Sequence, residues 1–593
     1  METYRRSLLN APKSGSGEIV ETLKKNSLKP QANDGEHKYT NTRITPKQPP
    51  PYRENDQFEL SLCSSNFDVT EFENSYIHLR LRFRFTFSAT DLPFITEEDE
   101  NHVDPAYKQL LQHQYVFIGF KASSHCIGSY SFKFHDKPIS STQQSQAVTE
   151  QFLYSNFKAK GEISNKKYVY SPYKEVSEFD NSICGRYISL WKILTNRNGD
   201  AFSMEVIIPY TELLIMQDFD EYPNFAFGDL KIVLQIIHDG LVFAPVNPIA
   251  SLRKAILRGD IPRDANGNLP DGMTSILALD SETMPYTHAF TQVGMKGKLS
   301  VITGVDRDHK VTSWNPTDFR IVVDETQVTE AYVDCRGYKM TNTARQELMQ
   351  HWQTHPFTVL AQKVTRSAFP TSPQPGELNT NFNVALNRVT DLYLLMPTDS
   401  LQRTCFCNPA LKNFQLQVGN ITYPNQAIST ISPEYHEQQI QQTDFDSIFE
   451  ATEEYEHSLT DCRVGRSGFK EPTTDDTGFV PIFMVERANA GTLIFDGLDS
   501  PNEKIELKGQ AINNNYNVYY KNNTVAPGPS GIAGTVENIP PPPILCMCSD
   551  TYWIFRLNGN EANVQYVTNS SYDAAYADPS LENTSAYSSE IMA

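Results

Sequence analysis

Two histidines and a glutamate recur at intervals of four residues in the middle of the chain. Glu347, His351 and His355 would share one face of a helix, and two histidines at that spacing can bind zinc. The segment lacks the H-E-x-x-H order of a zinc protease, and Leu348 and Trp352 give it an apolar side. Packing or hydrogen bonding is therefore favoured over a metal site.

The chain also contains the tripeptide Arg258-Gly259-Asp260. In an exposed loop this tripeptide can serve as a ligand for integrin receptors. A match this short is expected in on the order of one in ten chains of this length by composition alone. A chance match is therefore favoured, and a receptor role stays as the minor alternative.

Residues 264–268 offer oxygen ligands at alternate positions, like the start of a calcium loop. The sixth position is Leu269 instead of Gly, and the twelfth is Ser275 instead of Glu, so the bidentate ligand of such a loop is missing. We favour a plain Asn-Gly turn at this place.

Nine cysteines are present, an odd number with no repeating spacing, which suits a reducing compartment. Cys405 with Cys407, and Cys546 with Cys548, form C-x-C pairs that lack matching histidines for a zinc site. We predict buried, inert thiols. Four N-x-S/T sites are expected to stay unmodified, because no signal peptide is seen: Asn420, Asn522, Asn569 and Asn583.

Enzyme motifs are missing from the sequence. It contains no phosphate-binding loop, no dinucleotide-binding glycine pattern and no G-x-S-x-G nucleophile elbow, and its 13 histidines are scattered. The acidic run over 444–456 is most simply a solvated helix face. We predict a protein that is not an enzyme, with no catalytic, cofactor-binding or metal-binding residues and no cofactor.

Charge separates the ends of the 593-residue chain from its body. The whole chain carries a formal charge of -20, which repels phosphate backbones, whereas residues 1–50 hold nine basic and five acidic side chains. We expect a basic flexible arm over 1–51 and a polar acidic tail over 559–593. No stretch reaches 18 apolar residues, so neither secretion nor membrane insertion is expected.

The body between these ends has the patterns of strands. Residues 77–87 alternate strictly between apolar and polar side chains, as a long strand with one buried face does. Abundant Phe and Tyr, with 36 Pro and 29 Gly, also favour strands and turns. Further strands are predicted over 115–120, 130–134, 202–208 and 230–237.

A weak internal repeat relates the two halves. YVFIGF (115–120), FKFHDKP (132–138) and KIVL (231–234) have counterparts in LYLLM (392–396), FQLQVGN (414–420) and KIEL (504–507), at offsets of about 273 to 282. We predict an all-β fold of two tandem eight-stranded jelly rolls with short helices and long insertions. They would span 52–305 and 317–558, joined by a linker over 306–316.

In this order the motifs resemble the double jelly-roll major capsid proteins of icosahedral double-stranded DNA viruses, and particularly those of virophages and Polinton (Maverick) elements. In the second half the likeness rests on TCFCNP (404–409), FQLQVGN (414–420), VPI (480–482), FDGL (495–498) and DTYWIFR (550–556). In the first half it rests on 131–138 followed by 147–157. These signatures carry strands and turns and no catalytic group.

The resemblance implies trimeric, pseudo-hexameric capsomers that tile a shell around a double-stranded DNA genome, assembled in the host cytoplasm or nucleus. Implied partners are further copies of the chain, penton proteins and minor capsid proteins, with weak DNA contact through the basic arm. Insertions over 240–286, 423–479 and 511–543 are candidates for outer loops or clasps. The alternatives are a β-sandwich spike or adhesin that binds glycans or a receptor, and a jelly-roll glycosidase with two facing carboxylates.

Overall fold

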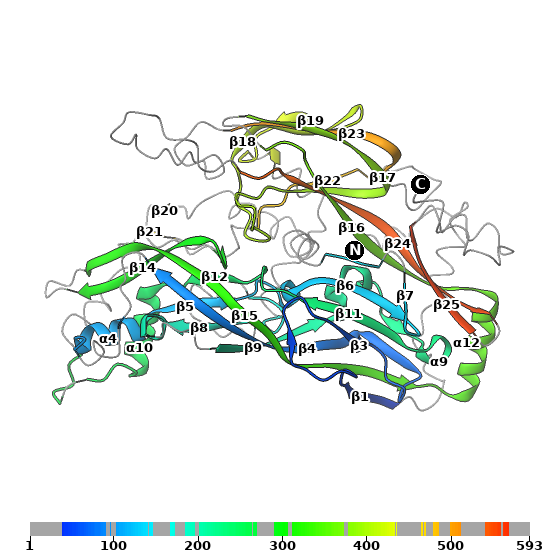
Figure 1. Ribbon diagram of the computed structural model, residues 1–593, viewed down its shortest axis with the longest axis horizontal. Coiled ribbons are helices and arrows are strands. Elements are labelled where there is room, and N and C mark those ends of the chain that lie inside the picture. Colours follow the sequence, from blue (N-terminus) through cyan, green and yellow to red (C-terminus); the bar gives the residue numbers. More distant parts are fainter. Residues whose placement is uncertain are drawn as a thin grey trace.

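The structure is a computed structural model that describes part of the chain. The described residues are 38–89, 95, 102–139, 142–145, 166–171, 184–195, 201–263, 265–269, 290–305, 311–372, 377–432, 434–435, 464–465, 468–469, 478–485, 498–511, 540–558 and 561–568. Strands dominate these residues, and they form two units that lie one above the other in Figure 1. The all-β prediction is confirmed.

One layer of the first unit is a seven-stranded sheet in which β15 pairs with β4 along most of its length. The strands are β1 (Lys38–Ile44), β2 (Tyr52–Arg53), β4 (Val69–Ala89), β9 (Ala201–Pro209), β10 (Glu221–Tyr222), β14 (Lys296–Val305) and β15 (Val311–Lys339).

Two four-stranded sheets complete the first unit. One has the order β3 (Gln57–Ser61), β11 (Leu230–Ile236), β6 (Ile127–Phe134) and β7 (Lys137–Pro138). The other has the order β13 (Thr291–Gln292), β12 (Val242–Pro245), β5 (Tyr115–Gly119) and β8 (Gly185–Ser189). Apolar side chains from all three sheets share one core, as the layers of a β sandwich do.

Short helices lie at the ends and loops of the strands. They are α4 (Pro105–Gln112), α8 (Leu190–Thr195), α9 (Asn224–Phe227), α10 (Pro248–Arg258) and α12 (Asn342–Thr354), with 3-10 turns at Ser123–Cys126, Tyr210–Glu212 and Leu214–Met216. Among the described residues, no helix is long and apolar enough to cross a membrane.

The alternation read from residues 77–87 is confirmed in β4. Its apolar side chains from Ile77 to Phe87 are buried, whereas Arg80, Arg82 and Arg84 lie on the outer face. Strands are also present at the other four predicted places, as β5, β6, β9 and β11. Period-two alternation marks β4, β6 and β9, of which only one face is fully covered by the core, whereas β5 and β11 are buried almost throughout and were located by their apolar residues between turn-forming segments.

The second unit is an eight-stranded sheet that bends over its own core. The strands are β16 (Phe357–Ala368), β17 (Glu377–Leu395), β18 (Leu411–Val418), β19 (Ile421–Ile428), β22 (Ile482–Met484), β23 (Leu498–Ala511), β24 (Ile544–Asn558) and β25 (Glu561–Thr568). The first half of β17 pairs with β23, and its last residues pair with β22 and β24. A two-stranded ribbon, β20 (Val464–Gly465) with β21 (Gly468–Phe469), is separate.

The two units share strand pairings that the sequence repeat anticipated. In the first unit β11 pairs with β6, which turns back into β7, and in the second β23 pairs with β18, which turns back into β19. Both turns need positive φ, at His135 and Asp136 in the first and at Gly419 in the second. The repeated segments therefore form equivalent hairpins beside equivalent strands.

Strand pairing moves the expected boundaries of the units. Residues 306–316 were expected to be a linker, but β15 begins at Val311 and pairs with β14 and β4, so the first unit extends to Lys339. Polar residues at a hairpin turn resemble a linker when only composition is read. Residues 306–310 lie outside the described residues.

Both expected flexible ends contribute a strand. Part of the arm, residues 38–44, is β1 and pairs with β15, and part of the tail, residues 561–568, is β25 and pairs with β24. The remaining arm and tail residues, 1–37 and 569–593, lie outside the described residues. Polar sequences at chain ends read as disordered, yet an edge strand needs only one apolar face or a good backbone partner.

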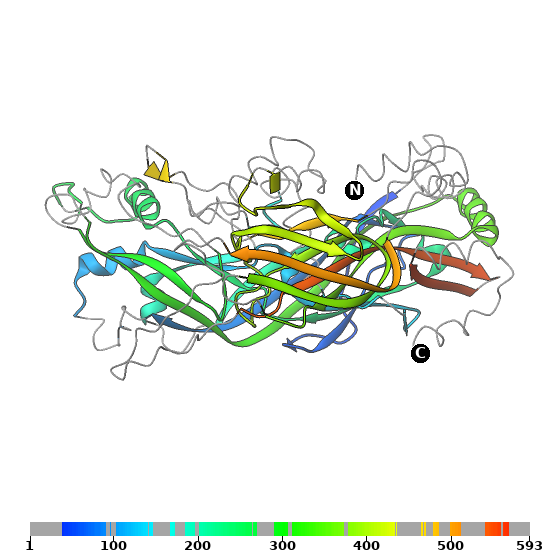
Figure 2. The ribbon, with the colours of Figure 1, turned by 90° about the horizontal axis from the view of Figure 1, so that it is seen from above.

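An inter-unit aromatic cluster joins the two units. Strands β16 and β24 run from the second unit along the first (Figure 1), and in Figure 2 the second unit lies directly over the first. Trp553 contacts Phe132 and Phe219 with ring centroids 5.3 and 6.0 Å apart, and its Nε1 donates to the Ile215 carbonyl at 2.9 Å. The cluster consists of Phe132, Phe134, Phe219, Tyr222, Phe227, Phe357, Trp553 and Phe555.

Candidate functional site

The N-terminal strand is held against the body by side chains as well as by backbone pairing. The Arg43 guanidinium lies 3.3 Å from the Asp334 carboxylate and 3.8 Å from the centre of the Tyr332 ring. Asp334 in turn lies 3.1 Å from Nε2 of His78, whose ring stacks on Tyr332 at 4.7 Å. These four side chains connect β1, β15 and β4, so they fix the place where the chain enters the first unit.

The protonation state of His78 follows from the groups around it. Burial lowers the pKa of His78, and the nearby carboxylates of Asp334 and Glu205 oppose that effect. Because the pKa of His78 is lowered, its imidazole is neutral at pH 7, and its contact with the Asp334 carboxylate becomes an ion pair only when the ring is protonated in acid.

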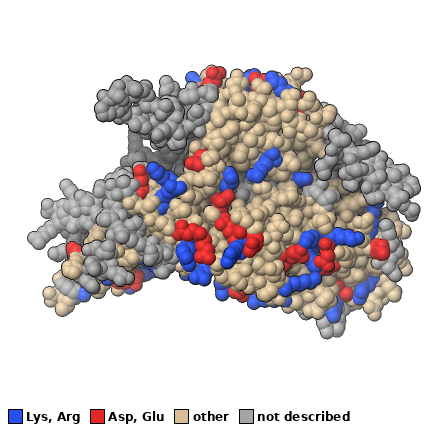
Figure 3. All heavy atoms as spheres, viewed as in Figure 1, with Lys and Arg blue, Asp and Glu red and all other residues tan. Residues whose placement is uncertain are grey.

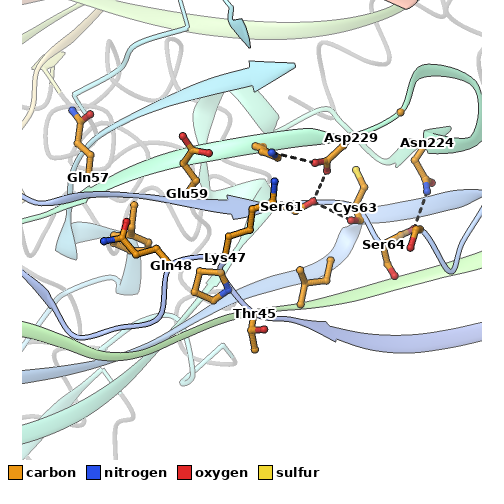
Figure 4. A pocket seen from close by; sticks show the side chains of 16 residues that line it. Thr45, Lys47, Gln48, Gln57, Glu59, Ser61, Cys63, Ser64, Asn224 and Asp229 are labelled. Carbon is orange, nitrogen blue, oxygen red and sulfur yellow. Dashed lines mark hydrogen bonds and ion pairs between the residues drawn. The ribbon is translucent and has the colours of Figure 1, made fainter. Parts of the chain in front are cut away.

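A cavity of about 690 Å³ lies beside the segment that follows β1. Figure 4 shows Thr45, Lys47 and Gln48 on one side of it and Ser61 and Asp229 on the other. The cavity lies between the N-terminal segment and the sheet of β3 and β11. Its lining comprises Ile44, Thr45, Pro46, Lys47, Gln48, Gln57, Phe58, Glu59, Ser61, Cys63, Ser64, Ser65, Asn224, Gly228, Asp229 and Lys231.

Lys231 is the most buried charge in this cavity. Its side chain is 7% exposed, it pairs with Asp136, and its Nζ lies 3.8 Å from the Asp229 carboxylate. The hydrogen bond that Lys231 donates to the Asp136 carboxylate raises the pKa of Lys231, while burial lowers it. Asp229 also accepts a hydrogen bond from Ser61, whose hydroxyl lies 3.1 Å from the Cys63 carbonyl (Figure 4). Lys231, Asp229 and Ser61 thus form one linked polar cluster at the cavity.

The cavity can form ion pairs and hydrogen bonds but has no activated nucleophile. Burial raises the pKa of Cys63 well above its usual value, so its thiol stays protonated at neutral pH. No histidine is among the 16 lining residues, so Ser61 has no imidazole base there. The arrangement is suited to holding residues 44–48 against the first unit.

Replacing Lys231 by methionine is expected to lower the free energy of unfolding by about 1–2 kcal/mol, because the charged hydrogen bond to Asp136 is lost. Lys133, on the neighbouring strand, makes a similar pair with Glu59 but is 28% exposed. Lys133→Met should therefore cost less than about 1 kcal/mol. Urea unfolding of both variants measures the difference, and equal costs would contradict a special role for the buried lysine.

The histidine pair singled out in the sequence is placed for packing. His351 and His355 stack with ring centroids 4.8 Å apart, but α12 ends before His355, whose Nδ1 lies 2.8 Å from the Thr354 hydroxyl. Trp352 is buried against Phe227 at 5.5 Å. Within the described part of the chain, no group of three or more potential metal ligands is found.

The cysteines of the described segments are free thiols, and seven of these eight are buried. Burial raises the pKa of Cys546 to about 12, and hydrogen bonding to Tyr393 opposes this rise. The two C-x-C pairs therefore lie in the protein interior as the sequence indicated, apart from Cys407, which is half-buried. The prediction of inert thiols is consistent with this protonation.

The structure describes only some of the other sites that the sequence singled out. Gly267 has φ +83°, as expected for an Asn-Gly turn, and Arg263 donates to its carbonyl at 3.0 Å, while Asp264 and Ser275 lie outside the described residues. Asn420 lies exposed in the β18–β19 turn. The acidic run 444–456, the sites at Asn522, Asn569 and Asn583, and most of the insertions 423–479 and 511–543 also lie outside the described residues.

Charged side chains of both signs are interspersed over the first unit. In Figure 3 they lie mainly in the lower part of the view, over the first unit. The upper part of the view, over the second unit, is largely neutral. On the outer face of the seven-stranded sheet, Arg80 lies 3.1 Å from Glu330 and Arg84 lies 3.4 Å from Glu325. These exposed pairs are screened by salt and stabilise the fold little. Their surface is suited to polar contacts between molecules.

Sequence reasoning missed a second contact between the units. The buried side chain of Gln292 accepts from the Arg403 backbone at 2.6 Å and donates to the Leu401 carbonyl at 2.6 Å. The loop between β17 and β18, which contains TCFCNP (404–409), is thus hydrogen-bonded to the first unit. A single glutamine within polar sequence gives no periodic signal, so only the fold reveals this role.

No family model matches the chain, and no curated protein matches its sequence. In three dimensions it is similar to the mavirus major capsid protein, with a TM-score of 0.42, 8% identity, and coverage of 89% of this chain and 90% of that chain. A chain of the Sputnik virophage matches with a TM-score of 0.39 and 10% identity, and the match covers 94% of this chain and 95% of that chain. The Faustovirus major capsid protein matches with a TM-score of 0.37 and 8% identity, and the match covers 90% of this chain and 93% of that chain. These matched structures come from virus particles or their major capsid proteins.

Proposed function

We propose that this chain is the major capsid protein of an icosahedral virus with a double-stranded DNA genome, and that three copies form a pseudo-hexameric capsomer. The observation that carries the proposal is the joining of two β units into one body. Strands β16 and β24 cross from one unit to the other, and Trp553 and Phe555 lie in the core of the first unit. The chain is therefore a rigid two-unit block and not two domains on a tether.

The geometry of such a block fits a closed shell. Three copies around a threefold axis place six similar β units in a ring, which approximates a hexagon and can tile a lattice. The paired strands and hairpins of the two units make them alike, and their different loops let them make different contacts. The sequence motifs described above support the same function.

Further partners are proposed from charge and position. The basic arm, of which residues 38–44 are fixed on the first unit by β15, would extend to neighbouring capsomers and make weak contacts with DNA. Penton and minor capsid proteins would occupy the remaining positions of the particle. The protein would be made and assembled in the host cytoplasm or nucleus and would reside in the virion without catalytic activity.

The mass of the purified chain in solution tests this function. We expect a stable trimer of about three times 67.2 kDa by native mass spectrometry and light scattering. Because each chain carries a charge of -20, raising the salt concentration should promote association of trimers into larger assemblies. A persistent monomer that binds glycans would instead support the adhesin alternative.

A further inference from the structure

The tripeptide Arg258-Gly259-Asp260 lies at an exposed end of the molecule. It begins at Arg258, the last residue of α10, and Figures 1 and 2 place this helix at one end of the first unit, opposite α12. All three residues are exposed, and the preceding Leu257 is 79% exposed. The sequence motif is therefore available at the surface of the chain.

The turn that presents the tripeptide has a defined geometry. The Gly259 amide donates to the Ile256 carbonyl at 3.2 Å, and the Asp260 amide donates to the Ala255 carbonyl at 3.0 Å. These two bonds, with Gly259 at φ +80°, form a Schellman motif. The backbone at the tripeptide is thus fixed by helix termination.

Buried side chains anchor both flanks of the turn. Ile256 on the helix and Ile261 after the turn are 2% and 1% exposed. They belong to a small core with Leu110, Ile249, Leu252, Ala255, Leu269 and Ile302. Because this core holds the flanks, the turn is pre-organised, and binding it costs little conformational entropy.

Asp260 acts electrostatically on His113 and Tyr115, and Arg258 acts on Tyr115, but neither charged side chain is paired with them. Within the described part of the chain, neither Arg258 nor Asp260 forms a salt bridge or a side-chain hydrogen bond. A β carbon built on Gly259 would meet nothing within 4 Å. Glycine is therefore required there by the backbone conformation and not by packing, and the space around it is open to a partner.

We propose that this turn is a receptor-binding site. The partner would be an adhesion receptor of the integrin type, which coordinates the Asp260 carboxylate through a divalent cation and binds the Arg258 guanidinium with its own carboxylates. Carboxylate oxygen is a favoured ligand of such cations, and a guanidinium forms paired hydrogen bonds with carboxylates. This inference does not depend on the capsid function, because a single chain presents the whole motif.

Binding of the full chain to an immobilised integrin ectodomain that recognises Arg-Gly-Asp tests the proposal. With Mn²⁺ present we expect saturable binding that EDTA abolishes and a free Arg-Gly-Asp peptide blocks. Asp260→Glu keeps the charge but misplaces the carboxylate, and should weaken binding by about 100-fold or more. Gly259→Ala disfavours the positive φ and should weaken binding by roughly tenfold.

Glu347→Asp is the matched control, because it changes the length of an exposed carboxylate side chain on α12 by the same one methylene. Its binding should equal that of the original chain. Absence of Mn²⁺-dependent binding by the original chain, or equal binding by Asp260→Glu, would overturn the proposal. The trimer mass is measured separately and should be the same for all four proteins, so failure of receptor binding is distinguishable from failure of the capsid function.

Discussion

Replacing Phe83 by aspartate is expected to prevent the first unit from folding. Phe83 is fully buried in the middle of β4, and its ring lies 5.8 Å from Phe85 and 6.2 Å from Phe120. The change removes the ring from a close-packed core and puts a carboxylate in its place. The combined loss of packing and cost of burying the charge should exceed about 4 kcal/mol.

Arg82 supplies the control, because it is the next residue on the same strand and its side chain is exposed. Arg82→Glu should change the free energy of unfolding by no more than about 0.5 kcal/mol. Soluble yield and circular dichroism separate the two outcomes, and urea unfolding gives the cost for the soluble variant. Similar tolerance of both substitutions would show that β4 does not have one buried and one exposed face.

The contrast between these neighbours explains why so much of the first unit is readable from sequence. Strands β4, β6 and β9 have one face on the core and one nearer solvent, so their apolar residues recur with period two, whereas β5 and β11 are buried almost throughout. The end of β17 shows a different pattern. Residues 392–396 are all buried, because one face packs inside the second unit and the other faces the first unit. A continuous apolar run marks such a strand but does not tell what covers each face.

Long-range pairing is what the sequence could not supply. Nothing in the composition of β15 says that it pairs with β4, some 240 residues earlier, and so the end of the first unit was placed at 305 instead of 339. The backbone bonds of a sheet leave no trace in side-chain type when the partner is distant. The edge strand β1 was missed for the same reason, whereas β25 pairs with the adjacent β24 and was missed because it was read as part of a polar tail.

The candidate site was less predictable than the fold. Lys231 was read as part of a repeated strand, and its burial against Asp136 depends on a hairpin that brings residues about 95 apart into contact. Arg43 lay in a segment expected to be flexible, and its place beside Asp334 follows from the pairing of β1 with β15. Ion pairs of this kind need three-dimensional proximity, which charge patterning along the chain does not encode.

Replacing Trp553 by alanine is expected to lower the free energy of unfolding by about 3–5 kcal/mol and to uncouple the two units. The indole is fully buried, it lies within 5.3 Å of Phe132 and 5.1 Å of Tyr566 by ring centroids, and its Nε1 donates to the Ile215 carbonyl. Truncation leaves a large void between the units and a buried carbonyl without its donor. In calorimetry, one cooperative transition should become two.

Trp191 provides the matched substitution, because it packs at the edge of the first unit and is only partly buried. Trp191→Ala should cost less and leave a single transition. Trp553→Phe retains most of the packing and should cost only the hydrogen bond and a small void, about 1–3 kcal/mol. If Trp553→Ala unfolds in one transition with the stability of Trp191→Ala, the inter-unit aromatic cluster does not hold the units together. Another contact would then have to hold the two units together as the rigid block that a capsomer requires. The loop contact through Gln292 consists of a few polar bonds and not of a core.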